Sequence, residues 1–302
     1  MSPESPESPG SPEPARQPAP PPLPQLIRVR GREFRVAAGP HAAFWREVAD
    51  GRWESQTFAV FERFLDRGHS YLDIGCWIGP TLLYGCQLAG RAYGLEPDPI
   101  AFEELQRNVR LNRPATDNVE LANLCIARES GEVAFGSRGA GGDSTSSLLF
   151  AKKHTHWTVR ALSFADFIEQ YGIRDCNFIK MDIEGGEYLI LPTMVDYLRA
   201  HRPTLHLSLH PCYLKLRPLG VLGRLIRRFT ATRRILRSIR FYRYLYDHNG
   251  RPMSPARLLW LCRARISLDI VLTDQPWPEA PPREPSPSPQ EPSPPPSSPS
   301  RP

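Results

Sequence analysis

The stretch Ser70–Asp98, SYLDIGCWIGPTLLYGCQLAGRAYGLEPD, decides the fold that we expect for this chain. Two short apolar runs of strand length flank a turn that contains Gly75 and Gly79. The first run and the turn are typical of a strand that bends sharply beneath a ligand before a helix begins near Pro80. The second run ends at Glu96, where a carboxylate can accept hydrogen bonds from both hydroxyls of an adenosine ribose. The stretch therefore predicts a nucleotide-type cofactor site with Glu96 as the ribose ligand.

Short strand patterns alternate with helical patterns along the rest of the chain. Residues 26–68 predict a two-stranded ribbon over an edge of the main sheet, followed by two helices. Further strands are expected at 119–127, 132–135, 158–162, 177–182, 204–210, 239–247 and 267–272, and a Gly- and Ser-rich loop at 136–150 that closes over a substrate or is a surface excursion. This alternation predicts an α/β fold with a mostly parallel sheet, helices on both faces and a last antiparallel strand at the edge.

The glycine spacing of the first turn distinguishes two kinds of nucleotide cofactor. A dinucleotide site needs Gly-x-Gly-x-x-Gly, whereas this chain has Asp73-x-Gly75-x-x-x-Gly79, with Trp77 at the position of the middle glycine. S-adenosylmethionine carries no phosphate, and its ammonium and sulfonium groups are cations that favour nearby carboxylates. The spacing therefore favours S-adenosylmethionine.

Motifs along the chain carry a more specific resemblance. They are WESQT (53–57), YLDIG (71–75), LEPDP (95–99), NVRLN (108–112) and FIKMDIEGGE (178–187). With them, the chain resembles the FkbM family of S-adenosylmethionine-dependent methyltransferases over roughly residues 53–273. The resemblance implies a class I methyltransferase (Rossmann-like) fold with a seven-stranded, mostly parallel sheet, and an enzyme of class EC 2.1.1. The cofactor-binding residues expected on this basis are Glu54, Asp73, Gly75, Cys76, Gly79 and Glu96.

Methyl transfer to a hydroxyl needs a group that aligns the acceptor and removes its proton. We predict Asp182 for this role, with Glu184 and His210 as further catalytic residues at the same edge of the sheet. These three and Glu187 are also candidate ligands for a divalent metal that would lower the pKa of the hydroxyl. In the alternative interpretation, Glu184 and Glu187 only stabilise the start of the next helix, and Lys180 forms a buried pair with Asp182.

A basic segment follows the predicted strand at 204–210. Residues 215–243 contain ten basic side chains and no acidic one, with apolar residues at helical spacing. We expect a basic amphipathic helix inserted at 213–238. An anionic glycan, a nucleic acid and a membrane surface are alternative partners for it, and a merely solvated face is the fourth interpretation.

The ends of the chain and its cysteines bound its class. Of the 34 prolines, 23 lie in residues 1–25 and 276–302, so we expect disordered, solvated tails at 1–25 and 275–302 around one domain at 26–274. The six cysteines include no Cys-x-x-Cys pair, which argues against a zinc site or a disulfide framework. Because the chain has neither a bilayer-length apolar run nor the pattern of a signal peptide, we expect a cytoplasmic protein without a transmembrane segment.

The expected function is O-methylation of a hydroxyl on a sugar or secondary metabolite, so the expected substrate is a small molecule or a glycan. A methyltransferase that uses the basic helix to hold RNA or protein is one alternative. A catalytically inactive binding protein with the same fold is another, because Cys76-Trp77 stands where the family usually has Ala-Asn, and Ser208 stands where many members have a glutamate.

Overall fold

The structure is a computed structural model that describes residues 23–37, 39–137, 142, 155–214, 221–264 and 266–278. The predicted tails fall almost wholly outside these ranges, and so does most of the predicted loop at 136–150. Within the described ranges, no helix is both long and apolar enough to cross a membrane.

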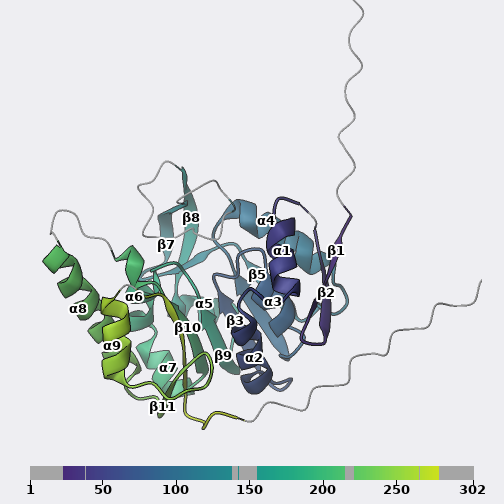
Figure 1. The fold of residues 1–302 in the computed structure, drawn as a ribbon. Helices are drawn as coiled ribbons and strands as arrows, with labels where there is room; N and C mark the ends of the chain where they lie inside the picture. The colour runs from purple at the N-terminus through teal and green to yellow at the C-terminus, as the bar shows by residue number, and fades with distance from the viewer. Residues whose placement is uncertain are drawn as a thin grey trace, which may run out of the picture.

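A seven-stranded sheet forms the centre of the molecule (Figure 1). Its order is β11-β12-β10-β9-β3-β4-β5, and within this sheet β12 alone runs in the direction opposite to the other six strands. The strands are β3 (Ser70–Ile74), β4 (Arg91–Leu95), β5 (Val119–Ala122), β9 (Cys176–Met181), β10 (Thr204–Leu209), β11 (Tyr244–Asp247) and β12 (Leu268–Thr273). The order and directions confirm the predicted α/β fold with a mostly parallel sheet.

The place of the last strand differs from the prediction. β12 lies between β10 and β11, so the edge of the sheet is β11. Residues Ile270, Val271 and Leu272 are buried on both faces of the sheet, whereas Tyr244 and Leu245 of β11 are only partly buried. A strand with two apolar faces is stable in the sheet interior, which explains why β12 is not the edge strand.

Helices cover both faces of the sheet, as the sequence predicts (Figure 1). One face carries α1 (Ala42–Ala49), α2 (Ser55–Phe64), α3 (Pro80–Gly85) and α4 (Pro99–Arg110). The other carries α5 (Phe164–Gln170), α6 (Glu187–Ile190), α7 (Val195–His201), α8 (Val221–Ile239), α9 (Pro255–Arg263) and the 3-10 helices η2 (Leu191–Thr193) and η3 (Pro211–Tyr213). The side chains of Tyr71 and Leu72, successive residues of β3, belong to different core clusters, because neighbours in a strand point to opposite faces.

The N-terminal ribbon is present but covers different elements from those predicted. It consists of β1 (Gln25–Val29) and β2 (Arg32–Val36), which pair only with each other. The ribbon contacts α1, α3 and α4 instead of an edge strand. Its inward side chains, including Ile27 and Phe34, are buried in the core cluster of that helical face. The apolar face of the ribbon therefore extends the helical layer.

The strand expected at 119–127 is in fact two strands in two sheets. β5 belongs to the main sheet, whereas β6 (Cys125–Ala127) pairs with β8 (Thr155–Ser163), which also pairs with β7 (Gly131–Ser137). Between them, the side-chain amide of Asn123 donates to the carbonyl oxygens of Glu96 (2.8 Å) and Pro97 (3.3 Å). These bonds hold the chain at the point where it leaves the main sheet beside the end of β4.

Gly75 allows β3 and β9 to end very close together. A Cβ at this position would lie 2.1 Å from the carbonyl oxygen of Asp182, and the backbone has φ +83°. We expect Gly75→Ala to lower the free energy of unfolding by about 2–5 kcal/mol, because the clash adds to the cost of a left-handed alanine. Urea unfolding measures this loss. Gly31→Ala is the control, because Gly31 has φ +85° but no atom within 4 Å of the added Cβ. Equal losses in the two variants would contradict the role of the close approach.

Candidate active site

Two cavities meet where β3 and β9 end. The first spans about 580 Å³ and the second about 700 Å³, including space that is open to solvent. The walls that they share are Gly75, Trp77, Asp182 and Glu184. The first cavity is otherwise mainly apolar, with walls that include Leu95, Leu124, Ile126, Phe135 and Ile183. The second is more polar, with walls that include Glu54, Thr81, Lys180 and His210. A ligand with one apolar and one charged end would fit across the junction.

Glu96 is held rigidly at the wall of the apolar cavity. Its two carboxylate oxygens accept one backbone hydrogen bond each, from the N–H of Trp77 (2.9 Å) and the N–H of Asp98 (2.8 Å). Burial raises the pKa of Glu96 to about 8, although these two bonds favour its ionised form. A carboxylate has about four acceptor positions, so Glu96 retains capacity for two hydroxyl donors from a ribose.

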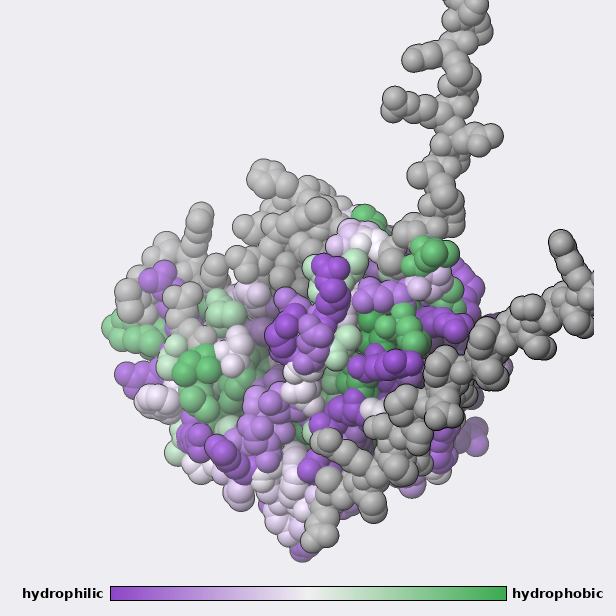
Figure 2. All heavy atoms as spheres, turned by 45° about the vertical axis from the view of Figure 1, so that its right-hand side comes forward, coloured by the Kyte–Doolittle hydropathy of each residue, from purple (hydrophilic) through white to green (hydrophobic). Residues whose placement is uncertain are grey.

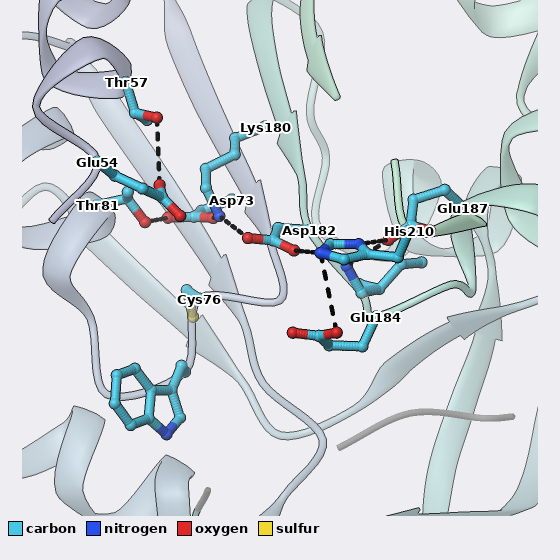
Figure 3. A network of polar contacts seen from close by, with 12 residues as sticks. Glu54, Thr57, Asp73, Cys76, Thr81, Lys180, Asp182, Glu184, Glu187 and His210 are labelled. Atoms are coloured by element: carbon cyan, nitrogen blue, oxygen red, sulfur yellow. Dashed lines mark hydrogen bonds and ion pairs between the residues drawn. The ribbon is translucent and has the colours of Figure 1, made fainter. Parts of the chain in front are cut away.

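Lys180 joins two carboxylates beneath the cavity junction (Figure 3). Its Nζ lies 3.5 Å from Oδ1 of Asp73 and 3.7 Å from Oδ2 of Asp182. Burial lowers the pKa of Lys180, but Asp73 and Asp182 raise it more, so the pKa stays above its usual value. Asp73 is itself fully buried and accepts hydrogen bonds from the hydroxyls of Tyr71 (2.8 Å) and Thr81 (2.7 Å). The predicted Lys180–Asp182 pair is therefore part of a larger network.

His210 links three carboxylates beside this network (Figure 3). Its Nε2 lies 3.8 Å from both Oδ1 of Asp182 and Oε2 of Glu184, and its Nδ1 lies 3.3 Å from Oε1 of Glu187. Burial lowers the pKa of His210, but the bond to Glu187 and the surrounding carboxylates raise it to about 10. His210 is therefore a cation at neutral pH in this arrangement, and it holds Asp182 and Glu184 at one place.

Glu187 has a different role from the other carboxylates. It is fully buried, and its Oε1 accepts hydrogen bonds from the backbone N–H groups of Ile183 (3.0 Å) and Gly185 (3.2 Å). These bonds fix the turn before α6, as the alternative interpretation predicts for this residue. The same Oε1 also contacts Nδ1 of His210, so Glu187 can fix the orientation of the imidazole ring.

Among the described residues, Asp182, Glu184 and His210 form a group that could hold a metal ion. One ligand atom from each lies within 4.8 Å of the other two. Burial raises the pKa of Glu184 to about 7, and its buried Oε2 makes no hydrogen bond with any described residue. This oxygen forms its ion pair with Nε2 of His210, 3.8 Å away, so two carboxylates and an imidazole converge there, which is a donor set that fits a divalent cation.

The predicted cofactor residues fall into two groups. Gly75, Cys76, Glu54 and Glu96 line one or both cavities. Asp73 and Gly79 line neither cavity. Asp73 contributes to the site through its ion pair with Lys180, and Gly79 is the residue before α3, with φ +97°. Burial and the nearby charge of Asp182 raise the pKa of Glu54 to about 8.

Three of the five described non-glycine residues with a left-handed backbone line the cavities. Glu54, Trp77 and Glu184 have φ values of 39°, 49° and 52°, which are unusual for residues other than glycine. Such conformations cost free energy and concentrate at functional sites. Their presence on three separate loops around one junction supports its assignment as the active site.

The pattern-based prediction missed Phe44 and most of the apolar walls. Phe44 lies between Trp53 and Trp77, with ring centroids 5.1 Å and 4.6 Å away, and all three line the second cavity. The indole of Trp77 also donates to the carbonyl oxygen of Gly142 (2.8 Å). Phe44 belongs to no sequence motif. It faces the cavity because α1 packs beside the turn after β3, and this packing cannot be read from the sequence around Phe44. Leu124 and Ile126 were more accessible to prediction, since they follow the third strand of the sheet.

A family model described as "Methyltransferase FkbM domain" matches residues 73–244, which is more than half of the chain. The chain belongs to the FkbM methyltransferase family. The match is narrower than the resemblance over residues 53–273, but it contains Asp73, Glu96, Asp182 and His210. The WESQT motif with Glu54 lies outside it.

Individual FkbM-type and other methyltransferases show distant similarity. The hexuronic acid methyltransferase AglP of Haloferax volcanii is 22% identical over 59% of this chain and 71% of its own length. The crystal structure of methyltransferase FkbM from Methylobacillus flagellatus is 18% identical, with a TM-score of 0.43, over 70% of this chain and 47% of that one. The O-methyltransferase from Bacillus cereus, solved in complex with SAH, is 11% identical, with a TM-score of 0.39, over 72% of this chain and 80% of that one.

Proposed function

We propose that this FkbM family member transfers a methyl group from S-adenosylmethionine to a hydroxyl of a sugar. The observation that carries the proposal is the junction of two cavities at Asp182, with a mainly apolar space beside Glu96 on one side and a charged space on the other. Family membership supports methyl transfer as the reaction class. The choice of a sugar rests on the relative that acts on a hexuronic acid.

The residues of the two cavities fit S-adenosylmethionine. Glu96 would accept the ribose hydroxyls, and the apolar walls around Leu124 and Ile126 would cover the adenine. The partly buried carboxylate of Glu54 would attract the ammonium group of the methionine part. Because Gly75 has no side chain, the backbone can approach the bound molecule closely at the junction.

The same geometry gives each polar residue a role in transfer. When bound, S-adenosylmethionine supplies an electrophilic methyl group on a sulfonium sulfur. Asp182 accepts the proton of the attacking hydroxyl, and Lys180 and His210 hold its carboxylate in position from two sides. Glu184 accepts a hydrogen bond from a neighbouring hydroxyl of the acceptor, which orients the attack in line with the sulfur. The buried walls exclude water from the junction.

We further propose that Asp182, Glu184 and His210 would hold a divalent ion such as Mn²⁺, which would take the place of the proton on Nε2 of His210. The ion would lower the pKa of the acceptor hydroxyl. Exhaustive chelation should then reduce turnover at least about 100-fold, and Mn²⁺ should restore it. In calorimetry, Mn²⁺ should bind the wild-type chain and fail to bind Glu184→Gln, while the exposed Glu169→Gln on α5 retains binding. Full activity after chelation, with no heat of Mn²⁺ binding, would leave the three residues as a charged cluster only.

Labelled methyl donor tests the function directly. Incubation of the chain with isotopically labelled S-adenosylmethionine and a panel of sugars, uronic acids and glycans should yield a product with the label on an ether oxygen. Calorimetry with S-adenosylmethionine alone separates this proposal from an inactive binding protein. An absence of binding heat at high protein concentration would favour the inactive alternative, for which Trp77 and Ser208 are the sequence reasons. Label in RNA or protein but in no sugar would favour the other alternative.

A further inference from the structure

The outward stripe of α8 is apolar in its first half and basic in its second. Leu222, Ile226 and Phe229 follow one another at helical spacing and are 71%, 55% and 43% exposed. Arg233 and Arg237 continue the same stripe and are also exposed. Within the described residues, the side chains of the outward stripe are therefore exposed and do not belong to the core.

The opposite side of α8 attaches the helix to the body. Thr232 and Ile235 are fully buried, and the Nε of the buried Arg228 donates to the carbonyl oxygen of Pro211 (3.2 Å). α8 also contacts α6 and α9. Because the helix is anchored on this side, its outward stripe keeps a fixed direction.

A groove runs along α8 next to this stripe. It spans about 1400 Å³, including space that is open to solvent, and its walls include the exposed Leu189 of α6 and the apolar Leu222 and Ile226. Arg227 and Arg234 also line it. Figure 1 places α8 at the left-hand edge of the molecule. Figure 2, turned by 45° from that view, shows apolar surface bordered by hydrophilic surface at its own left-hand edge.

We propose that the first half of α8 docks on the surface of an anionic phospholipid bilayer. Leu222, Ile226 and Phe229 would insert at the boundary between headgroups and acyl chains, and the arginines would lie at the level of the phosphates. α8 carries six arginines and no acidic residue, and all of the arginines except the buried Arg228 are at least partly exposed, so the exposed charge of the helix complements an anionic surface. This is the composition of a helix that lies on a membrane without crossing it.

Other partners fit the stripe less well. A nucleic acid would leave the three exposed apolar side chains without a complement, because its phosphates pair only with the arginines. A second copy of the chain, docked through the same stripe about a two-fold axis, would bring arginines against arginines if the two helices are parallel. If they are antiparallel, it would bring arginines against the apolar half. The proposal does not depend on the methyl acceptor.

Vesicle sedimentation of the full chain tests the proposal. The wild-type chain should sediment with vesicles of equal parts phosphatidylcholine and phosphatidylglycerol, and only weakly with pure phosphatidylcholine. Leu222→Ser/Ile226→Ser/Phe229→Ser should weaken the partition at least about tenfold, because the inserted apolar area is lost. Arg233→Gln/Arg237→Gln should weaken it by about fivefold per arginine, and added salt should do the same.

A control triple variant removes exposed apolar groups elsewhere. Leu23→Ser/Leu26→Ser/Ile100→Ser changes side chains that are 86%, 43% and 54% exposed, and it should retain vesicle binding. The proposal is overturned if the α8 apolar variant binds as well as the wild type, or if pure phosphatidylcholine binds equally well. It is also overturned if a single-stranded RNA oligonucleotide binds while anionic vesicles do not. Circular dichroism checks that each variant is folded, and the arginine variant provides an independent result if the apolar variant unfolds.

Discussion

Asp182→Asn should abolish methyl transfer while S-adenosylmethionine binds almost as before. The amide has the size of the carboxylate but cannot take a proton from the attacking hydroxyl, and loss of a general base typically costs about 10²–10⁴-fold in rate. Asp182 lies at the junction of the cavities, not at the wall where Glu96 is held, so we expect cofactor affinity to change by less than about threefold. Single-turnover kinetics with labelled donor measure the rate, and calorimetry measures the affinity.

A matched substitution separates chemistry from folding. Asp196→Asn changes an exposed aspartate on α7 and should keep wild-type turnover. Loss of Asp182 also leaves Lys180 with Asp73 as its remaining close carboxylate, so the stability of the variant must be checked by urea unfolding. Unchanged turnover in a folded Asp182→Asn variant would remove Asp182 from the role of base.

Glu96→Gln should weaken S-adenosylmethionine binding about 100-fold. Two charge-assisted hydrogen bonds to the ribose are weakened, and together they contribute about 3 kcal/mol. The glutamine can still accept one of the two backbone N–H bonds, from Trp77 or Asp98, so the turn should stay in place. Calorimetry measures the affinity, and Glu120→Gln, which breaks only the surface pair with Arg91, is the control. Equal affinity in wild type and Glu96→Gln would contradict the ribose role.

The raised pKa of Glu96 adds a pH dependence to this prediction. In the free protein its pKa is about 8, because burial disfavours the charged form. Hydroxyl donors from the ribose favour the ionised form, so binding lowers this pKa and releases a proton. Affinity should therefore rise as the pH increases towards about 8 and level off above it, and Glu96→Gln should flatten this rise.

Local patterns predicted the parts of the site that follow strands. Asp182, Glu96 and Gly75 each end an apolar run or follow one directly, and parallel strands bring such ends to one edge. The structure places all three at the two cavities. The pairing of β12 was mispredicted, because chain order alone does not state which of two late strands enters the sheet first.

The directions of individual side chains could not be predicted from the sequence patterns. The sequence put Glu187 among the metal candidates. Its Oε1 faces backbone N–H groups and His210, while its buried Oε2 makes no hydrogen bond with a described residue, so its role as a metal ligand stays a prediction. Trp77, one of the two residues in place of the usual Ala-Asn, was a sequence reason for the inactive alternative. The structure shows it as a shared wall of both cavities, packed on Phe44 and His41, and the effect of this wall on the cofactor stays a prediction.

The division of one expected strand into β5 and β6 has a thermodynamic consequence. The apolar cavity has walls from the main sheet and from the three-stranded sheet, including Leu95 on β4 and Phe135 on β7. A molecule bound there contacts both sheets, so its binding free energy also favours their association. By reciprocity, the factor by which binding favours attachment of the small sheet equals the ratio of affinities between the attached and detached states. A substitution that detaches the small sheet therefore weakens binding, by at most this factor. Attachment of the small sheet and binding of the nucleoside part of the cofactor are therefore thermodynamically coupled.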